Sequence, residues 1–198
     1  MTMPQLPMPA GKPMPALGFG TYELEGDTAR DAVRHALESG YRHVDTADMY
    51  GNHQQVRDGI ADAGVPRDQI FLVTKIWQDR LRRDDLLADA DRCLTELGVD
   101  YVDQLLIHWP NSDIAMDETL GAMSELIDAG KTRTIGVSNF TVEHLELALA
   151  ASKQPIAANQ VEFHPYLYQR DLLRFCREHN IAVVAYRPIV KGKVKRDA

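Results

Sequence analysis

The feature that most constrains the fold of this chain is a regular alternation of short apolar runs with amphipathic helical patterns. Seven runs are apolar enough to be parallel strands that are buried on both faces. Six helices are expected between them, the last and shortest over residues 170–179. Repeated strand–helix units of this kind predict a parallel sheet with helices packed against it. The seven expected strands cover residues 16–21, 41–47, 70–75, 102–108, 133–139, 156–163 and 181–188.

Residues typical of helix ends bound several of the helical patterns. Asp27 and Thr141 are expected to cap helix N-termini, because their side chains can accept a hydrogen bond from a free backbone N–H. Gly40, Gly98 and Gly130 are expected to end helices, because glycine adopts the left-handed conformation that often follows a last turn.

The C-terminal ends of the expected strands carry groups suited to chemistry. A single buried histidine at such a position is more often a core residue bonded to a backbone carbonyl, but here six strands end in this way. In a closed (β/α)8 barrel these ends converge on one mouth, whereas an open doubly wound sheet would leave the outer ones far from a central crevice. The sequence therefore predicts a single (β/α)8 TIM-barrel domain over residues 1–198, with seven strands and six helices present. The residues at the strand ends are Asp45, Lys75, His108, Ser138, Asn139, Gln160 and Tyr186.

Length and composition exclude several classes of protein. The 198 residues suit one domain, and 29 acidic against 22 basic residues give a net charge of −7, which argues against nucleic-acid or anionic-membrane partners. No run is long enough to span a membrane, and the N-terminus lacks the features of a signal peptide, so we expect a cytoplasmic protein. Cys93 and Cys176 lie on apolar helical faces and are expected to be free buried thiols.

Four of the groups expected at the mouth form a plausible acid–base set: Asp45, Tyr50, Lys75 and His108. No nucleophile elbow, zinc-binding histidine pair or Cys-x-x-Cys occurs, so we expect no metal site. With nucleophilic and metal-dependent chemistry set aside, these residues favour acid–base chemistry around a carbonyl oxygen. The Lys75 ammonium is expected to lower the pKa of the Tyr50 phenol, and Asp45 to hold the lysine in place. A neutral His108 could donate an N–H to the same oxygen.

Six motifs carry a resemblance to a known family: GFGTY, VDTADMYGN, VTKIW, LLIHWP, IGVSNF and NQVEFHPY. Together, in this order from Leu17 to Pro188, they resemble the aldo-keto reductase family. The segment from Gly18 to Gly20 is not a dinucleotide fingerprint, because Glu23 stands where the third glycine would be.

The resemblance implies a barrel that binds a nicotinamide cofactor, NADPH, without a Rossmann fold, and that transfers a hydride to an aldehyde or ketone. It assigns Tyr50 as proton donor, Lys75 and Asp45 as the residues that tune it, and His108 as the residue that orients the carbonyl. It further implies that cofactor contacts come from Gly20, Thr21, Tyr22, Asp45, Ser138, Asn139, Gln160, Tyr186 and Arg187, with Tyr186 stacking on the nicotinamide. Substrate contacts are implied for Tyr22, Trp77 and Trp109, although these aromatic residues could simply cap the barrel core.

The chain departs from the family pattern at its C-terminus. A (β/α)8 barrel typically takes roughly 250 residues, and no eighth strand can be found after Pro188. We expect a truncated chain that lacks the adenosine-binding segment and leaves its first and seventh strands as bare edges, which favours self-association. The complete parent is expected to be a monomer. A basic tail could contact a pyrophosphate, although solvation is the more common state of such residues: Lys191, Lys193, Lys195 and Arg196.

Two smaller departures concern single positions near the expected site. His53 follows the Tyr50-Gly51-Asn52 segment where the family usually has glutamate, and no catalytic role is assigned to it. Arg187 stands where a serine near the pyrophosphate is common.

Two function classes follow. The first is an NADPH-dependent reductase of small carbonyl compounds, resembling the small prokaryotic reductases of methylglyoxal and 2,5-diketo-gluconate. The alternative is an inactive fragment or a non-catalytic binding subunit on the same scaffold. An unrelated barrel hydrolase or isomerase is disfavoured, because no metal or phosphate-binding signature occurs.

Overall fold

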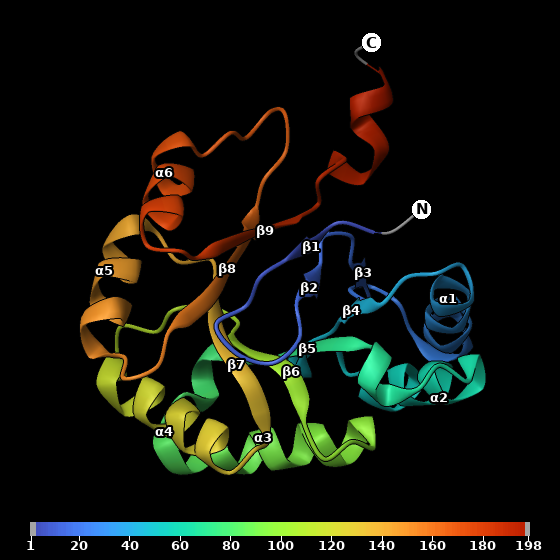
Figure 1. Cartoon of the computed structure of the whole chain (residues 1–198), viewed down its shortest axis with the longest axis horizontal. Coiled ribbons are helices and arrows are strands. Elements are labelled where there is room, and N and C mark those ends of the chain that lie inside the picture. The colour runs from blue at the N-terminus through green and yellow to red at the C-terminus, as the bar shows by residue number, and fades with distance from the viewer. Residues whose placement is uncertain (1–2, 197–198) are drawn as a thin grey trace.

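The computed structural model describes residues 3–196, with side chains described through residue 193. Seven parallel strands form one curved sheet, and six helices lie around its outer side in chain order (Figure 1). This is the predicted (β/α)8 architecture with seven of its strands present. Within the described residues, no helix is long and apolar enough to cross a membrane.

The strands of the main sheet follow chain order, and each pairs in parallel with the next. Every residue of β5 and β6 is buried, as expected for strands covered on both faces. The strands at the two edges differ: β3 has only two residues, and β9 has no fully buried residue. The bounds are β3 (Phe19–Gly20), β4 (His43–Asp45), β5 (Phe71–Ile76), β6 (Val102–Ile107), β7 (Thr132–Ser138), β8 (Ile156–Glu162) and β9 (Ala182–Tyr186).

Six helices connect these strands, which confirms the number predicted. Gly40, Gly98 and Gly130 all have positive φ and follow helix ends, as expected. Thr141 caps its helix by accepting a hydrogen bond from the backbone N–H of His144. The bounds are α1 (Gly26–Glu38), α2 (His53–Ala63), α3 (Arg83–Leu97), α4 (Met116–Asp128), α5 (Val142–Ala151) and α6 (Arg170–Glu178).

The prediction that Asp27 caps α1 is wrong. The helix already begins at Gly26, and the cap position belongs to Glu25, whose side chain makes no capping hydrogen bond. Asp27 lies in the first turn instead, where its negative charge interacts favourably with the positive end of the helix dipole.

A two-stranded antiparallel hairpin near the N-terminus was not predicted. It consists of β1 (Gln5–Leu6) and β2 (Met14–Pro15). Met14 is buried against Phe71, at the start of β5, so the hairpin covers the end of the barrel interior opposite the strand C-termini. Lys12 fixes it there through an ion pair with Asp103, 3.0 Å from Nζ to Oδ1. The hairpin sequence is proline-rich and has no alternating pattern, which explains why it escaped prediction.

Most of the hydrophobic core lies between the sheet and the helices, and a small second cluster fills the barrel interior. Cys93 and Cys176 are both buried and free, as predicted. Burial raises the pKa of the Cys93 thiol to about 12 and that of Cys176 to about 11, so neither is a reactive thiolate at neutral pH.

The sheet is open within the described part of the chain. β3 pairs only with β4, and β9 pairs only with β8. After β9 the chain forms a short 3-10 segment, η4 (Val190–Arg196), and Lys191 contacts Glu23 near the other edge at 2.9 and 3.0 Å. Lys193 is exposed, and the side chains of Lys195 and Arg196 lie outside the described residues.

Candidate active site

Lys75 lies at the centre of the groups that the strand ends bring together. Its side chain is completely buried in the barrel interior. The ammonium donates hydrogen bonds to Asp45 Oδ1 at 2.5 Å, to the backbone carbonyl of Thr46 at 2.8 Å and to the Tyr50 hydroxyl at 3.4 Å. A buried charge requires such compensation, since an unpaired ammonium in this place would be strongly destabilising.

Asp45 accepts hydrogen bonds at both carboxylate oxygens. Oδ1 binds Lys75, and Oδ2 accepts from Gln160 Nε2 at 2.7 Å. Its backbone carbonyl accepts from both the N–H and the hydroxyl of Thr21, at 3.0 and 3.2 Å. The carboxylate is therefore fixed at both of its oxygens and the backbone of the residue is held by Thr21, so Asp45 holds the lysine in one position.

Tyr50 lies on a short 3-10 turn, η1 (Asp48–Tyr50), that follows β4. Its ring packs against Tyr22 at 5.1 Å and edge-on against His108 at 5.7 Å, measured between ring centroids. Burial raises the pKa of the phenol above its ordinary value, while Lys75 acts in the opposite direction. The expected lowering effect of Lys75 on this pKa is confirmed, but the burial of Tyr50 outweighs it, so the net shift of the pKa is upward.

His108 follows β6, where its ring stands edge-on to Trp77 at 5.1 Å. Burial, with a further contribution from the Lys75 ammonium, lowers the pKa of the imidazole to about 4. The ring is neutral at neutral pH, as predicted, so it carries one N–H donor. Its Nδ1 atom is buried and has no hydrogen-bond partner among the described residues.

Ser138, Asn139, Gln160 and Tyr186 form a connected polar group at the ends of β7, β8 and β9. Asn139 donates to the backbone carbonyl of His108 at 3.0 Å and accepts from the Tyr186 hydroxyl at 3.0 Å. Ser138 donates to the backbone carbonyl of Gln160 at 2.8 Å. Asn139 has a φ of 63°, a left-handed conformation that asparagine tolerates better than most residues.

The amide and hydroxyl groups of this set fit a ligand that carries a carboxamide. Gln160 uses one N–H for Asp45, and an amide nitrogen has a second N–H to donate. The Tyr186 ring is half-buried beside these groups and offers an aromatic face.

The remaining predicted contact residues lie around the rim. Tyr22 and Trp109 are 47% and 40% exposed, while Trp77 is half-buried. Gly20 pairs in register with Asp45, and a Cβ at this position would meet nothing within 4 Å, so the local packing does not require glycine. Arg187 faces Glu162 at 3.8 Å, and the structure does not bring it into contact with the four central residues.

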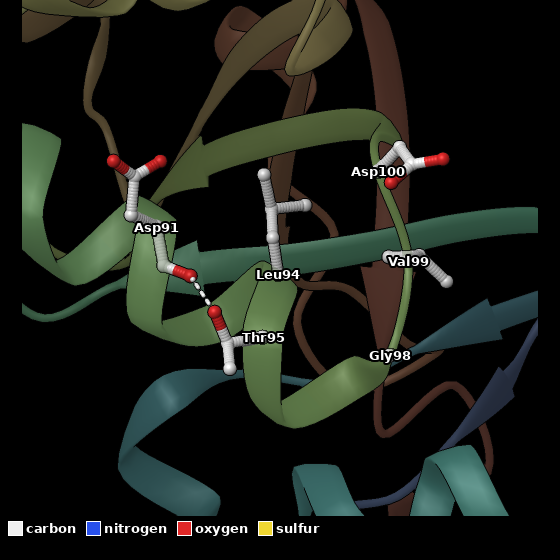
Figure 2. A pocket seen from close by; sticks show the side chains of 6 residues that line it. All are labelled: Asp91, Leu94, Thr95, Gly98, Val99 and Asp100. Atoms are coloured by element: carbon white, nitrogen blue, oxygen red, sulfur yellow. Dashed lines mark hydrogen bonds between the residues drawn. The ribbon is translucent and has the colours of Figure 1, made fainter.

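The hollows in the described part of the surface include two with polar residues in their lining. One of about 690 Å³ adjoins the site, because Trp109, Asn139 and Tyr186 line it together with the first residues of α5 and α6. The other, of about 540 Å³, lies at the C-terminal end of α3 beside Gly98 (Figure 2). Figure 2 shows Thr95 there, donating to the backbone carbonyl of Asp91, and no residue of the candidate site lines this second hollow.

Sequence reasoning missed Asn52, which joins two loops of the site. It is 2% exposed, and its amide donates to the backbone carbonyls of Thr21 and Leu24 at 2.9 and 3.0 Å. Its Oδ1 accepts from the Thr46 hydroxyl at 3.0 Å. The only signal in the sequence was its place after Tyr50-Gly51, in a loop where an asparagine is ordinarily a turn residue.

Comparison with known proteins shows that the chain is similar to aldo/keto reductases. The aldo/keto reductase family matches residues 16–197. Methylglyoxal reductase DkgB of Escherichia coli O157:H7 is 41% identical over 187 residues, which are 93% of this chain and 70% of that protein.

Two solved structures show the same likeness in three dimensions. One, assigned as a 2,5-diketo-D-gluconic acid reductase B, has a TM-score of 0.90 at 45% identity and covers 92% of this chain. The Bombyx mori aldo-keto reductase in complex with NADP has a TM-score of 0.89 at 35% identity and covers 94% of it. The chain spans 65% of the length of the first structure and 67% of the second.

Proposed function

The chain belongs to the aldo/keto reductase family, and on that premise we propose that it reduces small aldehydes and ketones to alcohols with NADPH. One observation carries the proposal: a fully buried Lys75 ammonium joins Asp45 to the Tyr50 hydroxyl beside a neutral imidazole. This set supplies a proton donor and a hydrogen-bond donor around one carbonyl oxygen.

Tyr50 is the proton donor in this proposal. Its raised pKa keeps the phenol protonated at neutral pH, so the proton is present when the carbonyl oxygen gains charge. Lys75 opposes the effect of burial on this pKa and stabilises the phenolate that remains after transfer. Asp45 and Gln160 keep the lysine from moving.

His108 orients the substrate in the same scheme. Since the imidazole is neutral and buried, it can donate its single N–H to the carbonyl oxygen without adding a second positive charge beside Lys75. Tyr22, Trp77 and Trp109 form aromatic walls around the entrance and suit a small organic substrate.

The nicotinamide cofactor, when bound, supplies the hydride that the carbonyl carbon receives. Asn139, Gln160 and Ser138 are the residues proposed to hold its carboxamide, and Tyr186 the ring that packs on it. NADPH is preferred over NADH in this proposal because the Bombyx mori relative is described in complex with NADP. Methylglyoxal is the first substrate to test, since the reductase of Escherichia coli O157:H7 bears that name.

Tyr50→Phe tests the proposal. The variant keeps the ring packing but loses the transferable proton, so turnover of methylglyoxal should fall by about 10²- to 10⁴-fold. NADPH affinity should stay close to that of the unmutated chain, because the proton is transferred only in the chemical step. The measurements are loss of NADPH absorbance under saturating cofactor and fluorescence titration with NADPH.

Tyr101→Phe is the matched control. Its ring packs against the guanidinium groups of Arg67 and Arg133, far from the strand C-termini, so turnover should not change. Near-normal turnover of Tyr50→Phe would remove the phenol from its role. NADPH binding without any turnover in the unmutated chain would favour the non-catalytic alternative.

A further inference from the structure

The backbone of the turn that carries Tyr50 makes few hydrogen bonds. η1 is held internally by two backbone hydrogen bonds, from Tyr50 to Ala47 and from Gly51 to Asp48, both 3.1 Å long. Met49 at its middle is 49% exposed. Such a turn has a defined shape, but these bonds do not fix where it lies relative to Lys75 on β5.

The first anchor of the turn is an ion pair with α3. Arg92 Nη2 donates to Asp48 Oδ1 at 2.6 Å. The same guanidinium donates to Glu96 Oε1 at 3.0 Å and contacts Asp89 Oδ1 at 3.2 Å. Arg92 is thus held by its own helix while it binds the start of the turn.

The second anchor is His53, the first residue of α2 and only 2% exposed. Its Nδ1 lies 3.0 Å from Glu96 Oε2, and its Nε2 lies 2.9 Å from the hydroxyl of Thr74. Thr74 directly precedes Lys75 on β5, and successive residues of a strand face opposite sides. The strand that directs Lys75 inward therefore holds the histidine on its outer side.

Both anchors meet at one carboxylate. Glu96 accepts from Arg92 with Oε1 and contacts His53 with Oε2. A continuous series of polar contacts therefore runs around the turn, through Asp48, Arg92, Glu96 and His53. We propose that His53, Glu96 and Arg92, named here the α3 clamp, are positioning residues that hold the Tyr50 hydroxyl within reach of Lys75. This inference rests on the proposed function, because it assigns the clamp to the proton-transfer step.

The proton arrangement of His53 agrees with this role. A carboxylate only accepts hydrogen bonds, so Nδ1 carries the hydrogen that binds Glu96. Burial lowers the pKa of His53, although Glu96 opposes this effect. The neutral ring then accepts a hydrogen bond from the Thr74 hydroxyl at Nε2. Both ring nitrogens are satisfied, so the side chain has no remaining donor or acceptor for a substrate.

The clamp matters for rate because the Tyr50 hydroxyl stands 3.4 Å from Lys75 Nζ, near the limit of a hydrogen bond. A displacement of about 1 Å in a catalytic group can reduce the rate by about 10²-fold. The hydrogen bonds that join Ser138 to Gln160 and Tyr186 to Asn139, on the cofactor side, do not involve the clamp. Cofactor binding and turnover should therefore respond differently to its loss.

The experiment compares Arg92→Met, His53→Leu and His53→Gln with Arg83→Met in the full 198-residue chain. Arg83 is the matched control, since it lies on the same helix and forms an exposed ion pair with Glu125 at 2.6 Å. Turnover of methylglyoxal under saturating NADPH, NADPH affinity and amide hydrogen exchange of residues 47–52 are measured for each variant. His53→Gln retains one donor and one acceptor, so it tests rescue.

Arg92→Met and His53→Leu should each lower kcat by about tenfold or more and speed exchange in residues 47–52, with NADPH affinity changed by less than about twofold. His53→Gln should recover most of the kcat, and Arg83→Met should match the unmutated chain. Arg92→Met alone decides the matter if His53→Leu fails to fold, because Arg92 is 43% exposed.

Unchanged kcat in Arg92→Met would overturn the clamp while leaving the proposed function intact. A parallel loss of kcat and NADPH affinity would also overturn it, because that pattern indicates general loosening. If the unmutated chain reduces no carbonyl compound, the proposed function fails first, and the catalytic role of the clamp fails with it.

Discussion

Replacing Lys75 by methionine removes the one positive charge in the barrel interior that faces Asp45. Methionine fills a similar volume, so the main change is electrostatic. The Asp45 carboxylate is 15% exposed and keeps only Gln160 as a side-chain hydrogen-bond partner, while the Thr46 carbonyl loses its 2.8 Å bond.

The size of the effect follows from the burial of the pair. Removing one partner of a buried ion pair costs about 3–5 kcal/mol, because the other charge stays in a poorly solvated place. A domain of this kind has a total unfolding free energy of about 5–15 kcal/mol, so Lys75→Met should fold but be markedly weakened. Lys75→Met with Asp45→Asn should recover much of the loss, since the amide carries no charge and can still accept from Gln160.

Urea denaturation followed by the fluorescence of Trp77 and Trp109 measures these differences. Lys191→Met is the control, because Lys191 also contacts a carboxylate but both partners are 56% exposed, and its loss should change stability by at most about 1 kcal/mol. A loss below about 1 kcal/mol in Lys75→Met, or a double variant as unstable as the sum of its two single variants, would refute the claim that the buried charges depend on each other.

Three further outcomes are expected. The folded pKa of His108 is about 4 against a usual 6.5, so its contribution to stability is present above pH 6.5 and is lost as the pH falls towards 4. Between pH 6.5 and 4, the unfolding free energy of His108→Gln should therefore fall by on the order of 3 kcal/mol less than that of the unmutated chain. Equal pH dependence of the two unfolding free energies would contradict this. Asn139→Ala should be less stable than Asn139→Gly by about 1 kcal/mol in thermal melts, since glycine, unlike alanine, accepts a φ of 63° without strain, and equal stability would argue against backbone strain. Because β3 and β9 are each unpaired on one side within the described residues, the chain should self-associate on concentration and bind NADPH weakly. A monodisperse monomer with tight NADPH affinity would contradict both expectations.

The sequence predicted the central strands of the sheet well because they are buried on both faces. Continuous apolar runs such as 70–75 and 102–108 leave little choice of structure, and β5 and β6 lie within one or two residues of them. The convergence of Asp45, Lys75 and His108 also followed from topology alone, because parallel strands place their C-terminal ends at one mouth.

The parts that sequence could not supply depend on contacts between distant segments. The β1–β2 hairpin is held by Met14 in the interior and by the Lys12–Asp103 pair, neither of which leaves a local pattern. The raised pKa of Tyr50 depends on how deeply the ring is covered, which no motif records. Sequence reasoning assigned His53 no catalytic role, yet its ring is buried and bonded to Thr74 and Glu96, which lie 21 and 43 positions away.

The chemistry of the site and the curvature of the sheet rest on the same carboxylate. In the order of the sheet, β4 and β8 are separated by β5, β6 and β7. At about 4.8 Å between neighbouring strands, a flat sheet would hold them roughly 19 Å apart. The 2.7 Å bond from Gln160 to Asp45 instead crosses the barrel interior and joins the two strands directly. Asp45 thus fixes Lys75 and, through Gln160, draws the far side of the curved sheet towards it, although the edges β3 and β9 are not paired with each other.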